Sequence, residues 1–277
     1  LAIRVVVGKE WPRRLALRLP SLRHVLLALL GLPGLIFVSS AIHAVAKLGF
    51  DRLFEKLGIP PHTSGMEEMV KIFGKWPWYW GVLVIGLGPG IGEELWCRGF
   101  LGRGLVGRYG YLVGILLTAS FFGIMHVDPP HVVATAFMGV ALHFTYIATK
   151  SLLIPMLLHT ANNSLAVLAM NWQRLAEIDN ANNSDNWGAV IVVAAGLLMT
   201  AVGWALYQSR ARLAPGQTLN PYPWQPDFPG VEHPPPASGT IVVYPRLDLR
   251  AALAVAVAFA LLALVLWQAL TEAGLGQ

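Results

Sequence analysis

The hydrophobic positions of this chain fall into seven long runs separated by shorter polar stretches. Each run is long enough to cross a bilayer as a helix, which takes about 20 residues. The sequence therefore predicts an all-α polytopic membrane helical bundle with about seven transmembrane helices. The predicted spans are residues 25–46, 78–105, 110–126, 131–149, 151–170, 187–207 and 251–270.

The composition agrees with a membrane protein. Of the 277 residues, 55% are hydrophobic and only 13% are charged, whereas soluble domains carry about 25% charged residues. The mean hydropathy is +0.57. The single cysteine, Cys97, excludes an internal disulfide and a metal site built from several cysteines.

Lysine and arginine are distributed unevenly around the predicted spans. If the N-terminus is cytoplasmic, most of them fall on the inside, as the positive-inside rule requires. The outside loop at residues 171–186 then has one cation, Arg174. We therefore predict a cytoplasmic N-terminus and an outside C-terminus. The predicted inside cations are Arg4, Lys9, Arg13, Arg14, Arg18, Arg23, Arg98, Arg103, Arg108, Lys150, Arg210, Arg212, Arg246 and Arg250.

The pattern of spans and polar stretches divides the chain into four parts. The stretch before the first span is basic, and the stretch before the last span is rich in proline, which prevents a regular helix. The letters TIVVYP near the end of this loop predict a short extended piece. The parts are a basic cytoplasmic interfacial segment (1–23), a membrane core (24–208, with its motifs in 78–170), a proline-rich cytoplasmic loop (209–250), and a final transmembrane helix with its tail (251–277).

Three charged residues occur together in the stretch GIGEELWCRGF. Ionisable side chains are costly at membrane depth, so each is a candidate functional residue. Glu94 and Arg98 are four residues apart and can pair on one helix face. Adjacent helical residues point about 100° apart, so Glu93 is left to point elsewhere. We expect it to face a cavity, where burial suits a carboxylate to general base catalysis.

Two later spans carry further polar residues. Phe122 and His126 lie four apart at the end of the third span. His159 and Asn163 share a face of the fifth span, where Pro155 predicts a kink.

Other polar residues have ordinary structural explanations. Asn162 can bind a backbone carbonyl of another helix. His143 is interpreted as a satisfied packing histidine. Asp128 and His131 belong to a short turn.

These side chains supply the parts of peptide hydrolysis inside a membrane. Glu93 could deprotonate a water, Asn163 could donate to the oxyanion, and the histidines could orient the water, stabilise the oxyanion or bind a metal. His126, His159 and a carboxylate would complete a three-ligand site for a divalent metal such as zinc with one open position. The spacing does not decide between metal-dependent and metal-free water activation. The chain has no His-Glu-x-x-His motif.

Three motifs follow one another along the predicted membrane helices. They read EELWCR (Glu93 to Arg98), FGIMH (Phe122 to His126) and HTANN (His159 to Asn163). In this order they resemble the CAAX protease and bacteriocin-processing family of intramembrane endopeptidases, which includes the type II CAAX prenyl proteases. The resemblance covers roughly residues 78–170.

The resemblance implies an all-helical fold with its site in a cavity near the cytoplasmic side. It implies that Glu93 is the catalytic base, that His126 and His159 hold the water or a metal, and that Asn163 steadies the oxyanion. Glu94, Arg98 and Phe122 would be supporting residues. The expected partners are a membrane-associated protein or peptide substrate and the lipid bilayer, and not nucleic acid. We expect an integral protein of the cytoplasmic membrane of a prokaryote.

The predicted topology conflicts with a single site formed by these motif residues. The predicted topology puts Glu93 and Arg98 toward the cytoplasm, whereas His126 ends an outward-going span. The groups would then lie on opposite sides of the bilayer. Either the second segment, which Gly and Pro interrupt before Glu93, does not cross simply, or the third span is short and His126 lies well inside.

Two other functions fit parts of the sequence. A non-catalytic scaffold or a bacteriocin-immunity-type protein could keep the polar residues as a structural core, although a scaffold has no need of Glu93. Broken helices and buried charges also occur in transporters, but the chain shows no repeated pair of interrupted spans. Because the sequence starts at Leu1, the chain could be the tail of a longer fused protein, a transporter included.

Overall fold

The computed structural model describes residues 15–59, 73, 76–176, 187–214 and 242–272. Most of the predicted basic segment, most of the proline-rich loop and the last five residues lie outside these ranges. The predicted division of the chain into four parts therefore stays a prediction.

Helices make up nearly all of the described chain, as predicted. Two of them are π-helices, labelled η, in which each N–H bonds five residues back. The helices are α3 (Leu22–Lys56), α5 (Trp78–Gly81), η1 (Val82–Leu87), α6 (Gly88–Glu94), η2 (Leu95–Leu101), α7 (Gly102–Ile124), α8 (Pro129–Thr149), α9 (Leu153–Ala176), α10 (Gly188–Gln208) and α11 (Leu249–Glu272). The strands β1 (Arg212–Leu213) and β2 (Val242–Val243) form one antiparallel pair, which confirms the extended piece predicted at TIVVYP.

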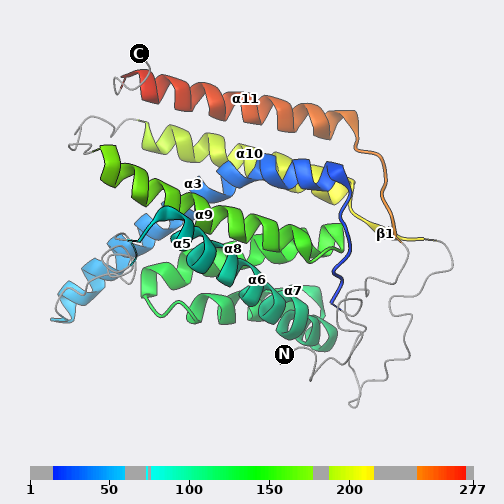
Figure 1. The fold of residues 1–277 in the computed structure, drawn as a ribbon, viewed down its shortest axis with the longest axis horizontal. Helices are drawn as coiled ribbons and strands as arrows, with labels where there is room; N and C mark the ends of the chain where they lie inside the picture. Colours follow the sequence, from blue (N-terminus) through cyan, green and yellow to red (C-terminus); the bar gives the residue numbers. More distant parts are fainter. Residues whose placement is uncertain (1–14, 60–72, 74–75, 177–186, 215–241, 273–277) are drawn as a thin grey trace.

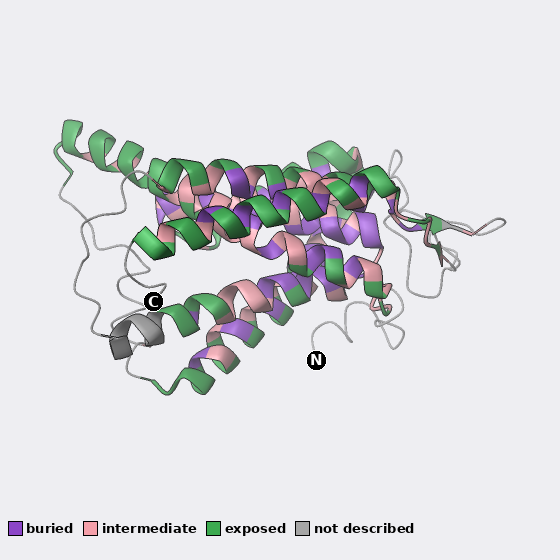
Figure 2. Ribbon diagram, turned by 90° about the horizontal axis from the view of Figure 1, so that it is seen from above, coloured by how far each residue is buried: buried purple, intermediate pink, exposed green. Residues whose placement is uncertain are grey.

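The helices pack side by side along one axis (Figure 1). α11 packs on α10, α10 on α3, α3 on α8, and α8 on α7, while α9 lies against η1 and α6. One apolar core joins α3, α10 and α11, and a second joins α3, α7, α8 and α9 around Phe122 and Leu142. Figure 2 shows the buried residues on the faces where helices meet and the exposed ones on outward faces.

Five helical stretches in the described part of the chain are long and apolar enough to cross a membrane. The predicted all-α membrane bundle is therefore confirmed, whereas the count of seven spans stays a prediction. The apolar part of α9, Leu153–Ala169, is shorter. The five stretches are Leu22–Lys56, Trp78–Ile124, Pro129–Thr149, Gly188–Gln208 and Leu249–Glu272.

The longest of these stretches turns back on itself at Gly110. Gly110 has φ 76° and ψ 175°, a conformation open to glycine and strained for other residues. The helices before and after it run antiparallel, because residues at matching distances from the turn are in contact. A Cβ on Gly114 would meet Val106, a Cβ on Gly102 would approach Thr118, and Arg98 lies over the Phe122 ring.

Because the chain turns back at Gly110, the polar groups do not lie on opposite sides of the bilayer, as was expected. The helical path that enters at Trp78 continues through Glu94 to Gly110, so Glu93 lies in its middle and not at its end. Glu93 is about as many residues before the turn as His126 is after it. The two side chains therefore reach the same depth. The expectation was wrong because the GLGPGIG stretch does not end the helix.

Glycines bring the Glu93 helix unusually close to α9. An added Cβ on Gly81, Gly86 or Gly90 would lie within 2.6 Å of Val167, Ser164 or Thr160, respectively. Small residues allow such close backbone approach between membrane helices. α6 and α9, which carry Glu93 and His159, are positioned by this contact.

Replacing Gly90 by alanine is expected to destabilise the protein by about 1–3 kcal/mol, the usual cost of overpacking. The added methyl would lie 2.8 Å from the Thr160 backbone, which cannot rotate away. Gly92→Ala is the matched control, because a Cβ on Gly92 meets nothing within 4 Å. Thermal unfolding in detergent checks the prediction, and equal midpoints for the two variants would contradict it.

Two local predictions also have clear outcomes. The short turn before α8 is confirmed, since Asp128 caps the helix by accepting a hydrogen bond from the His131 N–H at 3.2 Å. The kink expected at Pro155 is wrong. α9 begins at Leu153, so Pro155 lies in the first turn, where no earlier helical carbonyl requires its missing N–H.

Candidate active site

A fully buried ion pair lies at the centre of the site. Arg98 Nη1 donates to Glu94 Oε1 at 2.6 Å, and neither side chain is exposed. Arg98 Nη2 also donates to the Gly139 carbonyl at 2.9 Å, and its guanidinium lies 4.5 Å from the centroid of the Phe122 ring. The predicted Glu94–Arg98 pair is confirmed. Arg98 is buried in the bundle, however, and is not one of the cations at the inside interface.

His159 lies between the two adjacent glutamates. Its Nδ1 is 2.9 Å from Glu94 Oε1, and its Nε2 is 4.0 Å from Glu93 Oε2. A carboxylate only accepts, so Nδ1 carries the proton of this hydrogen bond. The Nε2 edge of the ring therefore faces Glu93. The two carboxylates reach opposite nitrogens of one ring because adjacent helical positions point in different directions.

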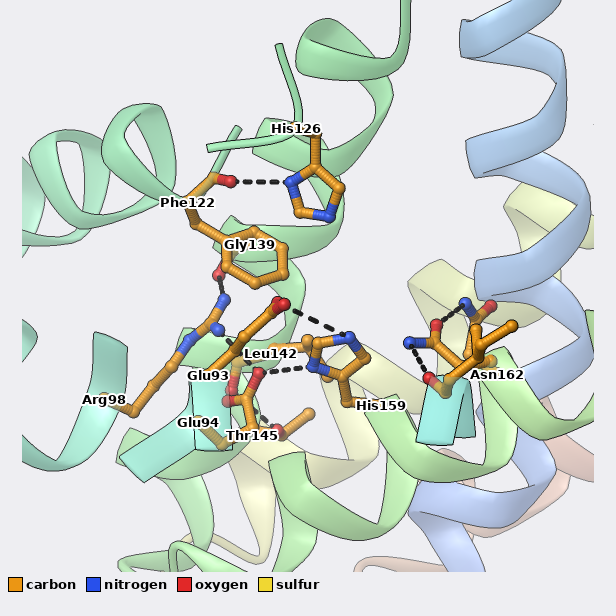
Figure 3. Close-up of polar contacts among 12 residues, drawn as sticks. Glu93, Glu94, Arg98, Phe122, His126, Gly139, Leu142, Thr145, His159 and Asn162 are labelled. Carbon is orange, nitrogen blue, oxygen red and sulfur yellow. Dashed lines mark hydrogen bonds and ion pairs between the residues drawn. The ribbon is translucent and has the colours of Figure 1, made fainter. Parts of the chain in front are cut away.

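Glu93 differs from Glu94 in its surroundings. The Glu93 side chain is 27% exposed, and its buried Oε2 has no hydrogen-bond partner among the described residues. Figure 3 shows the Glu93 carboxylate between the rings of His126 and His159. The ion pair thus neutralises one carboxylate and leaves the other facing a partly open space.

His126 follows the C-terminus of α7. Its Nδ1 is 2.9 Å from the Phe122 carbonyl, which only accepts, so Nδ1 carries the proton of this hydrogen bond. The Phe122 ring lies between the two motif histidines, with centroids 5.2 Å from His126 and 5.6 Å from His159. Phe122 therefore packs against Arg98 and both histidine rings and helps to hold their positions.

Two histidines that the sequence did not assign to the site, His131 and His43, continue from His126 in a row of neighbouring rings. The His131 ring is 5.2 Å from the His126 ring, and His43 is 5.7 Å from His131, centroid to centroid. His131 reaches His126 across the short turn before α8, while His43 comes from α3. The turn itself was the one sequence signal for His131, and no signal in the sequence connects His43 to the site.

Asn163 is held against the helix that carries Glu93. Its Nδ2 donates to the Ile85 carbonyl at 3.1 Å, and its Oδ1 accepts from Asn162 Nδ2 at 3.1 Å. Ile85 belongs to η1. Asn163, and not Asn162 as expected, bonds a carbonyl of another helix. One N–H of the Asn163 amide is used in this way, and the amide has two.

His143 lies inside the bundle as a packing residue, as predicted. His143 is fully buried, and a Cβ on Gly102 would lie 2.7 Å from its Cε1. The expectation that it is also satisfied was wrong, since neither ring nitrogen bonds a described residue.

The donor set fits a metal poorly. Among the described residues, no three His, Cys, Asp or Glu side chains come close enough together to hold one ion. We therefore derive no chemical step through a metal.

Part of the chain matches a known protein family. Residues 75–165 match the family model described as type II CAAX prenyl endopeptidase Rce1-like. This region belongs to the CAAX protease family. It contains Glu93, His126, His159 and Asn163, so the resemblance found in the three motifs is confirmed. No curated protein and no solved structure matches the chain.

The family and the apolar helices together establish the general class of the protein. It is an integral membrane protein with a CAAX-type intramembrane protease region. Proteases of this family act on membrane-associated peptide substrates within a lipid bilayer.

Proposed function

We propose that this chain is an endopeptidase that hydrolyses a peptide bond of a membrane-associated protein or peptide with a water activated by Glu93. The observation that carries the proposal is the 4.0 Å separation of Glu93 Oε2 and His159 Nε2. This distance is too long for a direct hydrogen bond. It suits a water that donates one hydrogen to the carboxylate and lies against the Nε2 edge of the ring.

The proposed reaction needs one proton carrier. Glu93 takes a proton from the water as its oxygen attacks the substrate carbonyl carbon, and the carbonyl electrons move to the oxygen. The second N–H of Asn163 donates to this oxyanion. When the C–N bond breaks, Glu93 returns the proton to the leaving amine. Glu94 holds the His159 ring in place, and Arg98 orients the Glu94 carboxylate.

We also propose the orientation and location that the cations support. Arg18, Arg103, Lys150 and Arg210 lie at the end of the bundle where α3 begins and α8 and α10 end. The positive-inside rule favours a cytoplasmic location for this end. The N-terminus would then be cytoplasmic, in the cytoplasmic membrane of a prokaryotic cell.

The test of the proposal uses the full chain in proteoliposomes. Membrane proteins from cells that lack the chain would be added, and new peptide termini would be identified by mass spectrometry. Termini that arise with the protein but not with empty liposomes are expected. Their absence, with folded protein present, would contradict hydrolysis and favour a non-catalytic scaffold or immunity-type role.

Removing metal ions is expected to leave cleavage unchanged. The described residues offer no three-ligand site, and the proposed water is held by side chains alone. The initial cleavage rate would be measured before and after dialysis against a chelator. Loss of activity that added zinc restores would contradict the metal-free reaction.

Asn163→Ala is expected to lower kcat by about 10²–10³, the effect of removing one oxyanion donor. Asn162→Ala is the control on the neighbouring position. It removes a bond to the Asn163 oxygen but no proposed donor, so we expect a smaller loss. Equal kcat values for the two variants would contradict the role of Asn163.

A further inference from the structure

The two ends of the bundle can be defined by α8. This helix has 21 residues and extends from its N-cap, Asp128, to its C-cap, Lys150. Its length is about 31 Å, close to the thickness of the hydrocarbon core. Lys150 lies at the end where α3 begins and α10 ends, which we call the basic end. The turn that carries His126 precedes α8 and lies at the other end, which we call the histidine end.

Contacts with α8 place Glu93 along this axis. The Gly139 carbonyl accepts a hydrogen bond from Arg98 at 2.9 Å, and the Tyr146 hydroxyl, nearer the basic end, accepts one from Arg103 at 3.2 Å. The helix that carries Glu93 therefore runs parallel to α8, toward the basic end. Glu93 precedes Arg98 on this helix, so it lies on the side of the buried ion pair that faces the histidine end.

Toward the basic end, buried side chains cover the site. Cys97, one turn beyond Glu93, is fully buried, and so are Tyr146 and Leu152. The packing here is close, since a Cβ on Gly99 would lie 3.3 Å from the Leu152 side chain. Together with the buried ion pair, these residues close the site toward the basic end.

Toward the histidine end, the polar side chains are partly exposed. Glu93 is 27% exposed, and His126 is half-buried. The rings of His126, His131 and His43 follow one another toward α3, with centroids 5.2 Å and 5.7 Å apart. Val127, in the turn beside His126, is 83% exposed. Ionisable side chains within membrane helices commonly line water-filled spaces, so this row indicates the side from which water reaches Glu93.

The turn beside His126 also has a strained backbone. Val127 has φ 64°, which is a genuine outlier for a β-branched residue. The Asp128 N–H donates to the His126 carbonyl across it at 2.7 Å. Strained residues of this kind are found at active sites and ligand clamps, which supports a functional role for the histidine end.

We propose that water and the substrate peptide enter the Glu93 site from the histidine end. With the basic end in the cytoplasm, as proposed above, the histidine end faces the outside of the cell. The substrate is then a membrane-anchored protein or peptide whose scissile bond is presented on the extracytoplasmic side. This inference rests on the proposed function, and it differs from the cytoplasmic-side cavity that the resemblance implies.

Thiol labelling of the full chain in membranes tests the side of entry. Cys97, the single cysteine of the sequence, is buried and is replaced by alanine. Single cysteines are then introduced as His131→Cys in the histidine row, Val127→Cys in the turn, and Arg212→Cys. Arg212 is exposed in β1, which follows α10 at the basic end (Figure 1). A charged, membrane-impermeant methanethiosulfonate reagent is applied to spheroplasts and to inverted membrane vesicles.

His131→Cys and Val127→Cys are expected to react in spheroplasts and to lose this reaction in inverted vesicles, and Arg212→Cys is expected to do the reverse. Reaction of His131→Cys from the same side as Arg212→Cys, or from neither side, would overturn entry from the histidine end. Reaction of Val127→Cys in inverted vesicles alone would overturn the extracytoplasmic substrate. If the His131→Cys protein does not fold, His43→Cys in the same row gives the same comparison.

This labelling needs no turnover of a substrate. Failure of the proposed hydrolysis would leave the labelling pattern unchanged and would show only as missing peptide termini in the proteoliposome assay. The two proposals can therefore fail separately.

Discussion

Replacing Glu93 by glutamine is expected to abolish cleavage while the protein stays folded. Glutamine keeps the shape of the side chain but cannot take a proton from water. General base catalysis contributes about 10²–10⁴ in rate, so kcat should fall by at least the lower of these factors. Turnover of a substrate peptide would be measured in proteoliposomes.

The fold should tolerate this change because Glu93 is not part of the buried ion pair. Its Oε2 lies 4.0 Å from His159 Nε2, which is too long for a direct hydrogen bond. Glu55→Gln is the control, since Glu55 is exposed near the end of α3. Equal thermal unfolding midpoints for both variants and the wild type are expected. A Glu93→Gln protein with normal kcat would remove Glu93 from the mechanism.

Replacing Arg98 by methionine is expected to have the largest effect on stability. It leaves the Glu94 carboxylate buried without its cation, and breaking a buried pair from one side costs about 3–5 kcal/mol. The Glu94→Leu/Arg98→Met variant removes both charges and should recover much of this loss. Thermal unfolding of the single and double variants in detergent measures the difference.

The double variant also separates stability from catalysis. It should fold, yet its kcat should stay low, because His159 Nδ1 has lost the carboxylate that fixes the ring. The exposed Lys47–Asp51 pair has the same four-residue spacing, with side chains 46% and 50% exposed. Breaking it should cost under about 1 kcal/mol. Similar losses of stability on breaking the Glu94–Arg98 pair and the Lys47–Asp51 pair would contradict the role of burial. Full activity of the Glu94→Leu/Arg98→Met variant would contradict the role of Glu94 in fixing the His159 ring.

The sequence predicted the partners within a helix better than the arrangement of helices. Glu94 and Arg98 pair as expected, because four-residue spacing fixes their relation on any helix. The depth of Glu93 was not predictable in this way. It depends on the turn at Gly110 and on a helix that continues through Pro89.

Pro89 shows why the GLGPGIG stretch was misread as a break. It lies in the first turn of α6, directly after the π-helix η1. At such a junction the hydrogen-bond pattern already changes, so the missing N–H of proline is tolerated. The glycines Gly86 and Gly90 on either side of it allow the close approach of α9. Local rules for glycine and proline cannot foresee a neighbouring helix.

His43 could not be connected to the site from the sequence. It lies on α3, far along the chain from His131, and contacts the His131 ring because α3 packs on α8. Contacts of this kind depend on tertiary packing, for which a single sequence carries no local signal. The motif residues could be found because their spacing repeats the helical period.

The most direct test of the central claim compares the membrane proteomes of cells that produce the wild type or the Glu93→Gln variant. New peptide termini would be identified by mass spectrometry, with Glu55→Gln as the control for expression. We expect termini that appear with the wild type and with Glu55→Gln but not with Glu93→Gln. The same termini in all three, or none in any while all three proteins are folded in the membrane, would contradict a peptidase that depends on Glu93.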